Sequence, residues 1–379
     1  KGDDLHPNYR SRLVAREIRR PGEDSIFAPT PPLESLRTVL SMATTDFNGE
    51  PKHVREDHSE ERTQISVIDI SRAYFNAGKE DDADPTYVEL PDEDADKKRG
   101  MAGLLRVHMY GTRAAAEGWH GEYSGALERL GFARGDASAC VFRHGGRRLV
   151  TSVHGDDFTT AGPKKQLDWL KKELEKCYEL KENYRIGPGA QDAKEARVLN
   201  HVIRWTARGV EYEADPRQAE RLILDLGLEG AKTVGTAGVK PTKEAVAADK
   251  ALATEKQTAF RGVTARGNYL AANRPDVQYA TKEICRWMAQ PSEAGLAALK
   301  RLGRYLEGHK RVIIDFPYQA ADKLDVYSDT DWSGCIRTRK STSGGCLMVG
   351  KHLMKSWSST QGPISLSSDE AEFCGVVKA

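Results

Sequence analysis

The sequence predicts a mixed α+β fold divided into two or three compact units, and three observations lead to this expectation. The chain has 379 residues, more than one hydrophobic core normally organises. Strand-like apolar runs alternate along it with longer segments of helical periodicity. After residue 322 several strand-like runs precede a helix that starts near Ser368, which is typical of a separate small α/β domain.

Composition and charge exclude several classes of protein. Lys and Arg number 57 against 56 Asp and Glu, a net charge of +1, so any nucleic-acid binding must come from local patches. With 39% hydrophobic and 30% charged residues the chain should be soluble and folded. No apolar run approaches the roughly 18 residues needed to cross a bilayer. The six cysteines are dispersed, which disfavours a structural zinc site and favours a reduced intracellular compartment.

The N-terminal region carries basic residues on a strand-like pattern. Residues 9–20 alternate apolar and basic side chains, which predicts an edge strand with cations on one face. Such a face is either simply solvated or contacts phosphate groups, because arginine forks suit phosphate oxygens, and both interpretations stay open. Residues 33–42 then predict a short amphipathic helix, and the polar stretch 44–64 predicts a surface loop.

One acidic residue stands in an unexpected place. Asp69 interrupts the apolar strand-like run 65–70, and a carboxylate is costly to bury unless a positive group, most simply a metal ion, lies against it. A pair of acids, Asp156 and Asp157, follows Gly155 between two apolar runs and predicts the exposed tip of a β-hairpin. Gly-Asp-Asp alone is ordinary turn chemistry, but together with Asp69 it indicates a candidate metal site.

The remaining elements follow from periodicity. The predicted strands cover residues 86–90, 139–143, 148–153, 198–205 and 210–213, and helical patterns cover 114–130, 167–178, 216–226 and much of 256–309. The helix near 293–309 has an apolar face and a basic face that carries Arg301 and Arg304. For this basic face, packing and template contact are both open.

Several short motifs occur in a fixed order along the chain. They are Arg12-Leu13-Val14-Ala15, Phe27-Ala28-Pro29 with the helix predicted at Leu36–Ala43, Ile68-Asp69 through Ala73-Tyr74-Phe75-Asn76, Tyr110-Gly111 through Trp119, Gly155-Asp156-Asp157, Asn273-Arg274-Pro275-Asp276-Val277, Tyr327-Ser328-Asp329-Thr330-Asp331-Trp332-Ser333-Gly334, Arg339-Lys340-Ser341-Thr342-Ser343-Gly344 and Ser367-Ser368-Asp369-Glu370-Ala371-Glu372-Phe373. Each motif is modest, but their order and spacing together are specific. On these residues nearly the whole chain resembles the polymerase segment of a copia-type (Ty1/copia) retrotransposon Pol polyprotein, with reverse transcriptase, connection region and the start of ribonuclease H.

The resemblance implies a fold and its boundaries. The fold is a right-hand polymerase with fingers, a ferredoxin-like palm and a helical thumb, followed by a connection region and an incomplete ribonuclease H-like α/β domain. Fingers and palm are expected in residues 1–214, and a thumb-like helix and linker in 215–255. The connection region is expected in 256–321 and the N-terminal part of the ribonuclease H-like domain in 322–379.

The resemblance also implies a reaction for the acids. Nucleotidyl transfer uses two Mg²⁺ (or Mn²⁺) ions, one to activate the primer 3′-hydroxyl and one to hold the triphosphate. By resemblance, Asp69 and Asp156 are bridging metal ligands and Asp157 supports them. Ile70 is expected to contribute its backbone carbonyl, as the matching residue does in the family.

Other positions match nucleotide- and primer-binding residues of the family. Tyr74 lies five positions after Asp69, where related polymerases place a ring that excludes a 2′-hydroxyl; the alternative is that Tyr74 is a core residue. Arg12 and Arg16 match basic positions that hold the incoming dNTP. The turn that positions the primer is expected near Leu199-Asn200-His201.

The C-terminal part resembles ribonuclease H. Asp329 matches its first catalytic, metal-binding acid, and the second is Glu370 or Glu372. Glu372 is preferred because apolar and small residues follow it, as in the family helix. The chain begins without Met and ends at Ala379 in mid-pattern, so we expect a segment of something longer, with the remaining ribonuclease H acid further on. The segment alone is therefore expected to lack ribonuclease H activity.

The acid hairpin departs from the family pattern. Copia-type elements usually carry Tyr and a branched apolar residue before the acid pair, whereas this chain has His154 and Gly155. Losing the Tyr removes a ring near the primer terminus, and Gly155 is expected to loosen the turn. Neither change removes a metal ligand, so altered efficiency or fidelity is expected rather than inactivity.

Three functions are consistent with the sequence. The first is an RNA-directed DNA polymerase that uses dNTPs with an RNA template and DNA primer or an RNA–DNA hybrid. The second is a decayed or domesticated nucleic-acid-binding scaffold, and the third is an interaction module of a larger assembly. The first is favoured, in an intracellular setting (cytoplasmic virus-like particle or nucleus), without membrane contact and without the protease and integrase parts of Pol in this segment.

Overall fold

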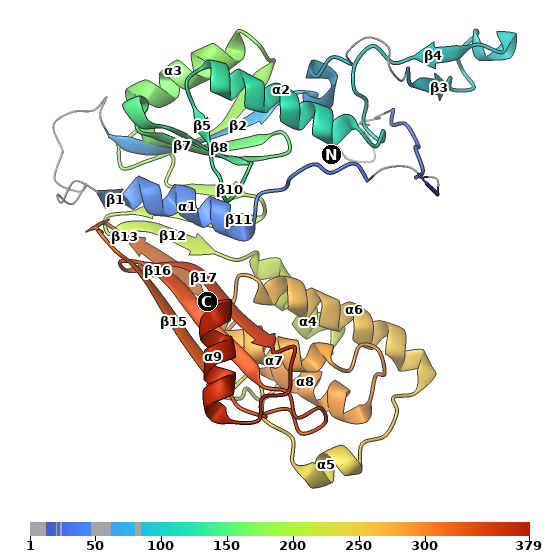
Figure 1. The fold of residues 1–379 in the computed structure, drawn as a ribbon, viewed down its shortest axis with the longest axis vertical. Coiled ribbons are helices and arrows are strands. Elements are labelled where there is room, and N and C mark those ends of the chain that lie inside the picture. The colour runs from blue at the N-terminus through green and yellow to red at the C-terminus, as the bar shows by residue number, and fades with distance from the viewer. Residues whose placement is uncertain (1–12, 20, 23–24, 47–61, 80–84) are drawn as a thin grey trace. The chain divides into compact units, whose positions relative to one another are not determined.

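The computed structural model describes residues 13–19, 21–22, 25–46, 62–79 and 85–379, which are drawn in colour in Figure 1. The chain divides into two units: the first contains Lys1–Val39 and Thr63–Arg185, and the second contains Leu40–Arg62 and Ile186–Ala379. Both units contain helices and strands, which confirms the predicted mixture of α and β structure. The expected boundary at residue 214 lies inside the second unit, and the division into fingers, palm, thumb and connection stays a prediction.

The first unit is built on a six-stranded sheet. Its strands lie in the order β5 (Ala133–Arg134), β6 (Val141–His144), β7 (Leu149–His154), β8 (Asp157–Pro163), β2 (Thr63–Ile70) and β9 (Leu180–Ile186). Helices α2 (Ala115–Arg129) and α3 (Lys164–Glu175) cover one face of this sheet (Figure 1) and share its hydrophobic core. Strand β9 was not among the predicted strands because its sequence is mostly polar.

Strand alternation decides which side chains reach that core. Ile68 and Ile70 of β2 and Phe158 of β8 are fully buried in the core that α2 and α3 share. Successive side chains on a strand point to opposite faces of the sheet. Asp69 and Asp157 therefore point to the face opposite the two helices.

Shorter elements complete the first unit. They are α1 (Leu33–Thr44), whose last turn belongs to the second unit, the 3-10 helices at Ala73–Asn76, Lys97–Arg99 and Gly145–Arg147, and the pair β3 (Tyr87–Glu89) and β4 (Ala102–Leu104). The predicted edge strand is wrong for residues 13–19, which form no strand. Instead the N–H groups of Ala15 and Glu17 donate to the carbonyls of Tyr110 and Gly111, at 2.8 and 3.4 Å. The rest of that prediction lies outside the described residues.

The helices of the second unit share one core. They are α4 (Pro216–Asp225), α6 (Thr254–Ala271), α7 (Pro275–Cys285) and α8 (Glu293–Gly308), with the short α5 (Lys243–Ala247) beside them in sequence. In α8, Leu302 is buried while Arg301 donates to the hydroxyl of Thr236 and Arg304 to the carbonyl of Lys232, at 2.7 and 2.6 Å. Both arginines thus bind the segment that precedes α5. The interpretation that the basic face of α8 serves packing holds for these two residues.

A four-stranded antiparallel sheet belongs to the same unit. It consists of β10 (Glu195–Val198), β11 (His201–Thr206), β12 (Gly209–Glu213) and β13 (Ile313–Pro317), and β1 (Thr45–Asp46) pairs separately with β14 (Gln319–Ala320). The strand predicted for 198–205 is confirmed over residues 201–205 of β11, but Leu199 and Asn200 have positive φ of 48° and 67° and form a tight turn between β10 and β11. Two positive φ angles are typical of a type I′ hairpin.

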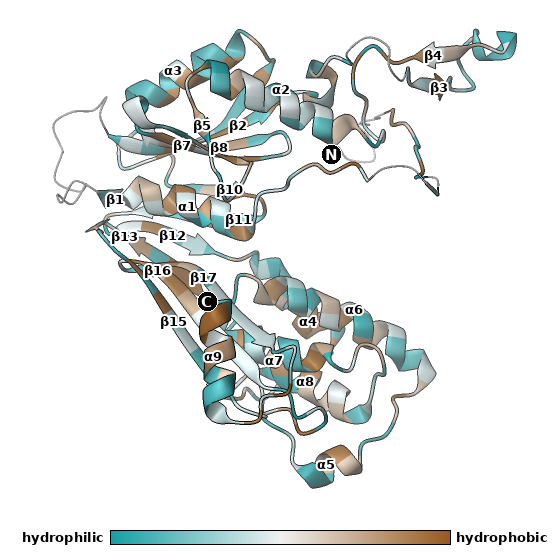
Figure 2. Cartoon of the chain, in the orientation of Figure 1, coloured by the Kyte–Doolittle hydropathy of each residue, from teal (hydrophilic) through white to brown (hydrophobic). Residues whose placement is uncertain are grey.

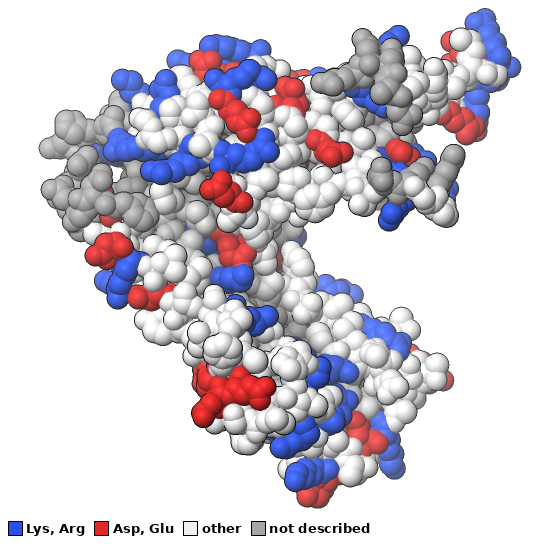
Figure 3. All heavy atoms as spheres, viewed as in Figure 1, with Lys and Arg blue, Asp and Glu red and all other residues white. Residues whose placement is uncertain are grey.

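The C-terminal strands and helix follow the predicted order, but they belong to the second unit together with the residues from Ile186 on. Strands β15 (Leu324–Asp331), β16 (Thr342–Val349) and β17 (His352–Thr360) form an antiparallel sheet, followed by α9 (Ser368–Lys378). Figure 2 shows hydrophobic residues at the end of α9, where Val376 and Val377 are exposed. Among the described residues no helix is both long and apolar enough to cross a bilayer. Both signs of charge occur on the visible face of each unit (Figure 3).

The Asn273-Arg274 motif has a structural role. The Tyr212 hydroxyl of β12 donates to the Asn273 side chain at 2.8 Å. Arg274 is 1% exposed and donates to the carbonyls of His309 and Lys310, just after α8, at 2.8 and 3.3 Å. The motif therefore joins the sheet to α7 and to the end of α8.

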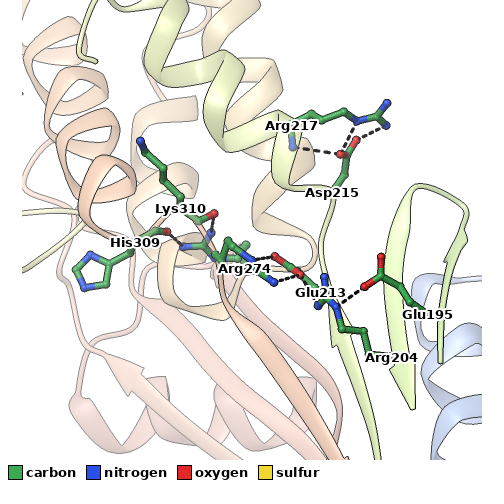
Figure 4. Close-up of polar contacts among 9 residues, drawn as sticks. Glu195, Arg204, Glu213, Asp215, Arg217, Arg274, His309 and Lys310 are labelled. Atoms are coloured by element: carbon green, nitrogen blue, oxygen red, sulfur yellow. Dashed lines mark hydrogen bonds and ion pairs between the residues drawn. The ribbon is translucent and has the colours of Figure 1, made fainter. Parts of the chain in front are cut away.

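A buried carboxylate pairs with two arginines at one end of the β10–β13 sheet. The Glu213 side chain is 2% exposed and accepts hydrogen bonds from Arg204 at 2.7 Å and from Arg311 at 2.5 and 2.8 Å. Arg204 also contacts Glu195 at 2.7 Å, as Figure 4 shows. These contacts, with that of Arg311 first, lower the pKa of Glu213 below its ordinary value. Paired in this way, the buried charge stabilises the sheet.

We predict that Glu213→Gln destabilises the second unit by about 3 kcal/mol, because two arginines lose their shared carboxylate. The matched control is Glu195→Gln, whose side chain is 60% exposed and contacts only one of those arginines. This control should cost less than about 1 kcal/mol. Urea unfolding of the three proteins measures both differences, and equal effects of the two substitutions would contradict the assignment.

The same contact has a predictable pH dependence. Because the folded-state pKa of Glu213 lies below its ordinary value of 4.5, its stabilising contribution is present above pH 4.5 and is lost as the pH falls through the folded pKa. Stability measured between pH 7 and pH 3 should therefore fall less steeply in Glu213→Gln than in the wild type. Parallel curves would show that Glu213 does not carry this term.

Candidate functional site

Two strands bring the three predicted acids of the first unit together. Asp69, near the end of β2, lies opposite Asp157, the first residue of β8, in the antiparallel register. The N–H of Ile70 donates to the carbonyl of Asp156 at 2.9 Å. Backbone pairing thus joins Asp69 with Asp157 and Ile70 with Asp156, so the two acidic segments meet although they lie far apart in sequence. Ile70 itself is fully buried.

The acids influence one another electrostatically. The pKa of Asp157 is raised to about 6, first by burial and then by the charges of Asp156 and Asp69. The pKa of Asp69 is also raised, by burial and by Asp156, and the nearby Lys181 of β9 opposes this rise. Like charges held close together each favour the protonated form of the other. The cluster is therefore a concentration of negative charge that this chain only partly balances.

This donor set fits a hard divalent cation. Carboxylate oxygens are the ligands that Mg²⁺ and Mn²⁺ prefer, and a bound cation would relieve the repulsion that raises the two pKa values. Within the described part of the chain, no three His, Cys, Asp or Glu side chains already stand in metal-binding geometry. The acids are thus close enough to influence one another's charge, but the structure does not show them arranged around an ion.

The turn that carries Asp156 requires its glycine. Gly155 has φ +62° and sits first of the two residues that join β7 to β8. A positive φ at this position is typical of a type II′ hairpin, and glycine adopts it without the cost that a side chain incurs. Gly155 therefore suits the turn, and the expectation that it loosens the turn is not supported by this backbone. His154 is exposed and lies opposite Asp157 in the hairpin register.

A tryptophan at the end of one of the matching stretches contacts the same turn. The indole N–H of Trp119 in α2 donates to the carbonyl of Gly155 at 2.8 Å, and the side chain is 1% exposed. The matching stretch contains Trp119 but gives it no role. Its partner is 36 positions away, so no local pattern announces the contact.

The predicted nucleotide-binding residues have different placements. Tyr74 is half-buried, and its ring centroid lies 4.5 Å from that of Tyr110. Phe75 meets the edge of the same Tyr110 ring at 5.6 Å and is 39% exposed. Arg16 is exposed in the segment that bonds to Tyr110 and its neighbour, and Arg12 lies outside the described residues. The Tyr74 side chain is thus only partly buried and packs against the Tyr110 ring.

Comparison with known proteins shows what this chain is similar to. Residues 1–187 match the family model described as reverse transcriptase (RNA-dependent DNA polymerase). Across 97% of the chain, 30% of residues are identical to the retrovirus-related Pol polyprotein from transposon RE1 of Arabidopsis thaliana, and 29% to that from transposon RE2 of the same plant. This chain is a homologue of copia-type retrotransposon Pol polyproteins.

The relationship extends along nearly the whole chain. The Pol polyprotein from transposon TNT 1-94 of Nicotiana tabacum is 24% identical over 98% of this chain. The chain spans about a quarter of the length of these relatives, 24% of each Arabidopsis polyprotein and 27% of the tobacco one. The resemblance that the motifs indicated is therefore confirmed.

In this copia-type Pol homologue the two C-terminal acids lie on different elements of the second unit. Gly375 of α9 packs on the side chains of Ser328 and Thr330, so α9 covers the face of the β15–β17 sheet to which these residues point. Asp329, between them, points to the other face, where it lines a cavity of about 620 Å³ next to α7. Glu372 is exposed on α9. The structure does not place both on one face of the sheet.

Helix capping separates the two candidate glutamates. The N–H of Glu370 donates to the hydroxyl of Ser367 at 3.1 Å, and the Glu370 carboxylate accepts from the N–H of Leu366 at 2.7 Å. Glu370 is thus engaged at the N-terminus of α9, in the manner of a capping residue. This contact is consistent with the preference for Glu372, which stays a prediction.

We predict that Gly155→Ala lowers the stability of the first unit by about 1 kcal/mol, because alanine must adopt a left-handed conformation there. Gly145→Ala is the matched control. At both positions nothing lies within 4 Å of the added carbon, but only Gly155 has a positive φ. The control should therefore change stability by less than about 0.5 kcal/mol. Thermal unfolding of the three proteins measures the difference, and a Gly145→Ala effect as large as that of Gly155→Ala would contradict it.

Proposed function

We propose that the chain is an RNA-directed DNA polymerase that extends a primer with dNTPs by a two-metal mechanism. Membership of the Pol family makes it a homologue of polymerase-type enzymes. The observation that carries the finer proposal is the meeting of Asp69 with Asp156 and Asp157 where β2 and the β7–β8 hairpin end. Burial and like charge raise the pKa of Asp69 and of Asp157, which costs stability and favours a functional reason for the cluster.

The proposed roles follow from the donor set. Two Mg²⁺ or Mn²⁺ ions would activate the primer 3′-hydroxyl and stabilise the pyrophosphate that leaves. Asp69 and Asp156 would hold them through carboxylate oxygens, and Ile70 through its backbone carbonyl. Asp157 would support the other two acids. What the chain itself contributes is position: the β2–β8 register and the bond from Ile70 to Asp156 keep these oxygens together.

Tyr74 would select the sugar. A ring beneath the incoming nucleotide clashes with a 2′-hydroxyl, and the half-buried position of Tyr74 leaves part of its ring accessible. Its contact with Tyr110 limits how far the ring can retreat. Arg16, with Arg12, would contact the triphosphate, because guanidinium groups bind phosphate oxygens in pairs.

We propose the same domain division as the resemblance implies. Residues 1–214 would form fingers and palm, 215–255 the thumb-like segment, 256–321 the connection region, and 322–379 the beginning of a ribonuclease H-like domain. In the last of these, Asp329 and Glu372 would be the catalytic acids. The β10–β11 turn at Leu199 and Asn200 would contact the primer, since its tight geometry presents two residues at a hairpin tip.

Primer extension on an RNA template with Mg²⁺ or Mn²⁺ tests the proposal. We predict extension by the wild-type chain and a loss of at least about a hundredfold in Asp156→Ala, because a metal ligand supplies several kcal/mol to the transition state. Asp136→Ala is the control, since Asp136 is an exposed acid of the same unit outside the cluster.

The outcomes separate the three functions. Extension that Asp156→Ala abolishes and Asp136→Ala preserves supports the polymerase. Salt-dependent binding of primer–template without extension supports a nucleic-acid scaffold. Absence of both extension and binding supports an interaction module.

Sugar selection gives a second prediction. Tyr74→Ala should reduce the preference for dNTP over rNTP by about tenfold or more, because the clash with the 2′-hydroxyl disappears. Tyr74→Phe keeps the ring and should retain the preference. Steady-state kcat/KM for each nucleotide measures it. An unchanged ratio in Tyr74→Ala would show that Tyr74 is only a packing residue.

A further inference from the structure

One buried side chain on the helix-covered face of the sheet contacts the acid hairpin of the first unit. Trp119 lies in α2, on the face of the sheet opposite the acids, and its side chain is 1% exposed. Its indole N–H crosses to the turn and donates to the carbonyl of Gly155 at 2.8 Å. The turn therefore has the acids on one face of the sheet and its hydrogen-bond partner, the tryptophan, on the other.

The tryptophan is itself tightly held. Its ring lies 5.6 Å from that of Tyr123 and 5.5 Å from that of Tyr178, with edge contacts typical of aromatic clusters. Tyr178 is fixed in turn, because its hydroxyl donates to Glu122 at 2.9 Å. The indole N–H of Trp119 is therefore held in a fixed position in the core.

The contact acts on Asp156 through the backbone. The carbonyl of Gly155 belongs to the peptide group that precedes Asp156, and Trp119 fixes its orientation. The carbonyl of Asp156 belongs to the peptide group that follows, and the N–H of Ile70 fixes that one at 2.9 Å. With both flanking peptide planes anchored, the two soft dihedrals of Asp156 are determined. The direction in which its Cα–Cβ bond leaves the turn is then determined as well, which limits where the carboxylate can stand.

We propose that Trp119 is a positioning residue for Asp156. It sets where the exposed carboxylate stands relative to Asp69 and Asp157 by holding the preceding peptide group. The catalytic part of this proposal rests on the proposed function, because the position of Asp156 matters for the reaction only if Asp156 is a metal ligand. In its structural meaning, as the anchor of the hairpin tip, it stands on the contacts alone.

The chain supplies a matched pair of substitutions for the test. Trp119→Phe keeps an aromatic ring in the cluster but removes the N–H donor together with part of the ring volume, so the control must make the same change. Trp205→Phe in the second unit is the control, because Trp205 is also buried, at 6% exposure, and also donates its indole N–H at 2.8 Å, to the Tyr318 hydroxyl. Both variants lose one equivalent hydrogen bond, but only the first loses it at the acid hairpin.

Amide hydrogen exchange in the full 379-residue chain is the first measurement. Trp119→Phe should speed exchange of the hairpin peptide 153–158 by about threefold to tenfold, the effect of losing one net hydrogen bond, while Trp205→Phe leaves this peptide unchanged. Unchanged exchange there in Trp119→Phe, or equal acceleration in both variants, would overturn the proposal. This outcome does not depend on whether the chain is a polymerase.

Mn²⁺ affinity is the second measurement and concerns the functional meaning. Titration with Mn²⁺ alone should show about threefold to tenfold weaker binding in Trp119→Phe than in Trp205→Phe. If hairpin exchange rises but Mn²⁺ affinity stays at the wild-type value, the role in ligand positioning is overturned and Trp119 is only structural. If wild-type and Asp156→Ala chains bind Mn²⁺ equally, the proposed metal site fails instead, which this comparison distinguishes.

Discussion

Mutual repulsion among three carboxylates is the constraint on which the candidate site depends. Asp69, Asp156 and Asp157 gain nothing from one another, and the raised pKa values of Asp69 and Asp157 show the direction of the effect. They are held together by neutral interactions: the register of β2 with β8, the bond between Ile70 and the Asp156 carbonyl, and the core under the sheet. The fold of the first unit supplies the free energy that keeps this site assembled.

In the second unit the pKa of a buried acid is shifted in the opposite direction. Glu213 lies between Arg204 and Arg311, and its pKa is lowered, so its charge is satisfied within the protein. The pKa of Asp157 is raised to about 6, first by burial and then by neighbours of the same sign. A satisfied charge is typical of a structural contact, whereas a concentrated and unsatisfied one is typical of a site that awaits a cation or substrate. The two acids thus show within one chain how structure and function use charge differently.

The site could be predicted as far as local patterns reach. An acid inside an apolar strand and a Gly-Asp-Asp turn are both visible in sequence, and strand alternation places Asp69 and Asp157 on one face. Trp119 could not be found in this way, because its role depends on a contact with Gly155 that only the packing of α2 creates. Gly155 was expected to loosen the turn because it departs from the family pattern, whereas its φ of +62° shows a position that favours glycine. The sign of a glycine's effect depends on backbone geometry that the residue type alone does not give.

The fold shows the same division between local and distant information. Most of the helices followed from periodicity, while β9 and β13 were missed because short strands of mixed polarity depend on their partners in the sheet. The basic face of α8 was open between two interpretations until Arg301 and Arg304 were seen to contact the preceding segment. Asp329 was matched by its motif, but the motif does not tell which face of the sheet it occupies; the packing of Gly375 does.

The central claim is that the acids where β2 and the hairpin end bind divalent cations for nucleotide addition. Crystals of the chain with primer–template, a dNTP and Mn²⁺, measured by anomalous scattering, test it most directly. The account predicts Mn²⁺ coordinated by the carboxylates of Asp69 and Asp156, with the triphosphate beside them. An ordered primer–template and nucleotide with no anomalous peak at these two residues would contradict it.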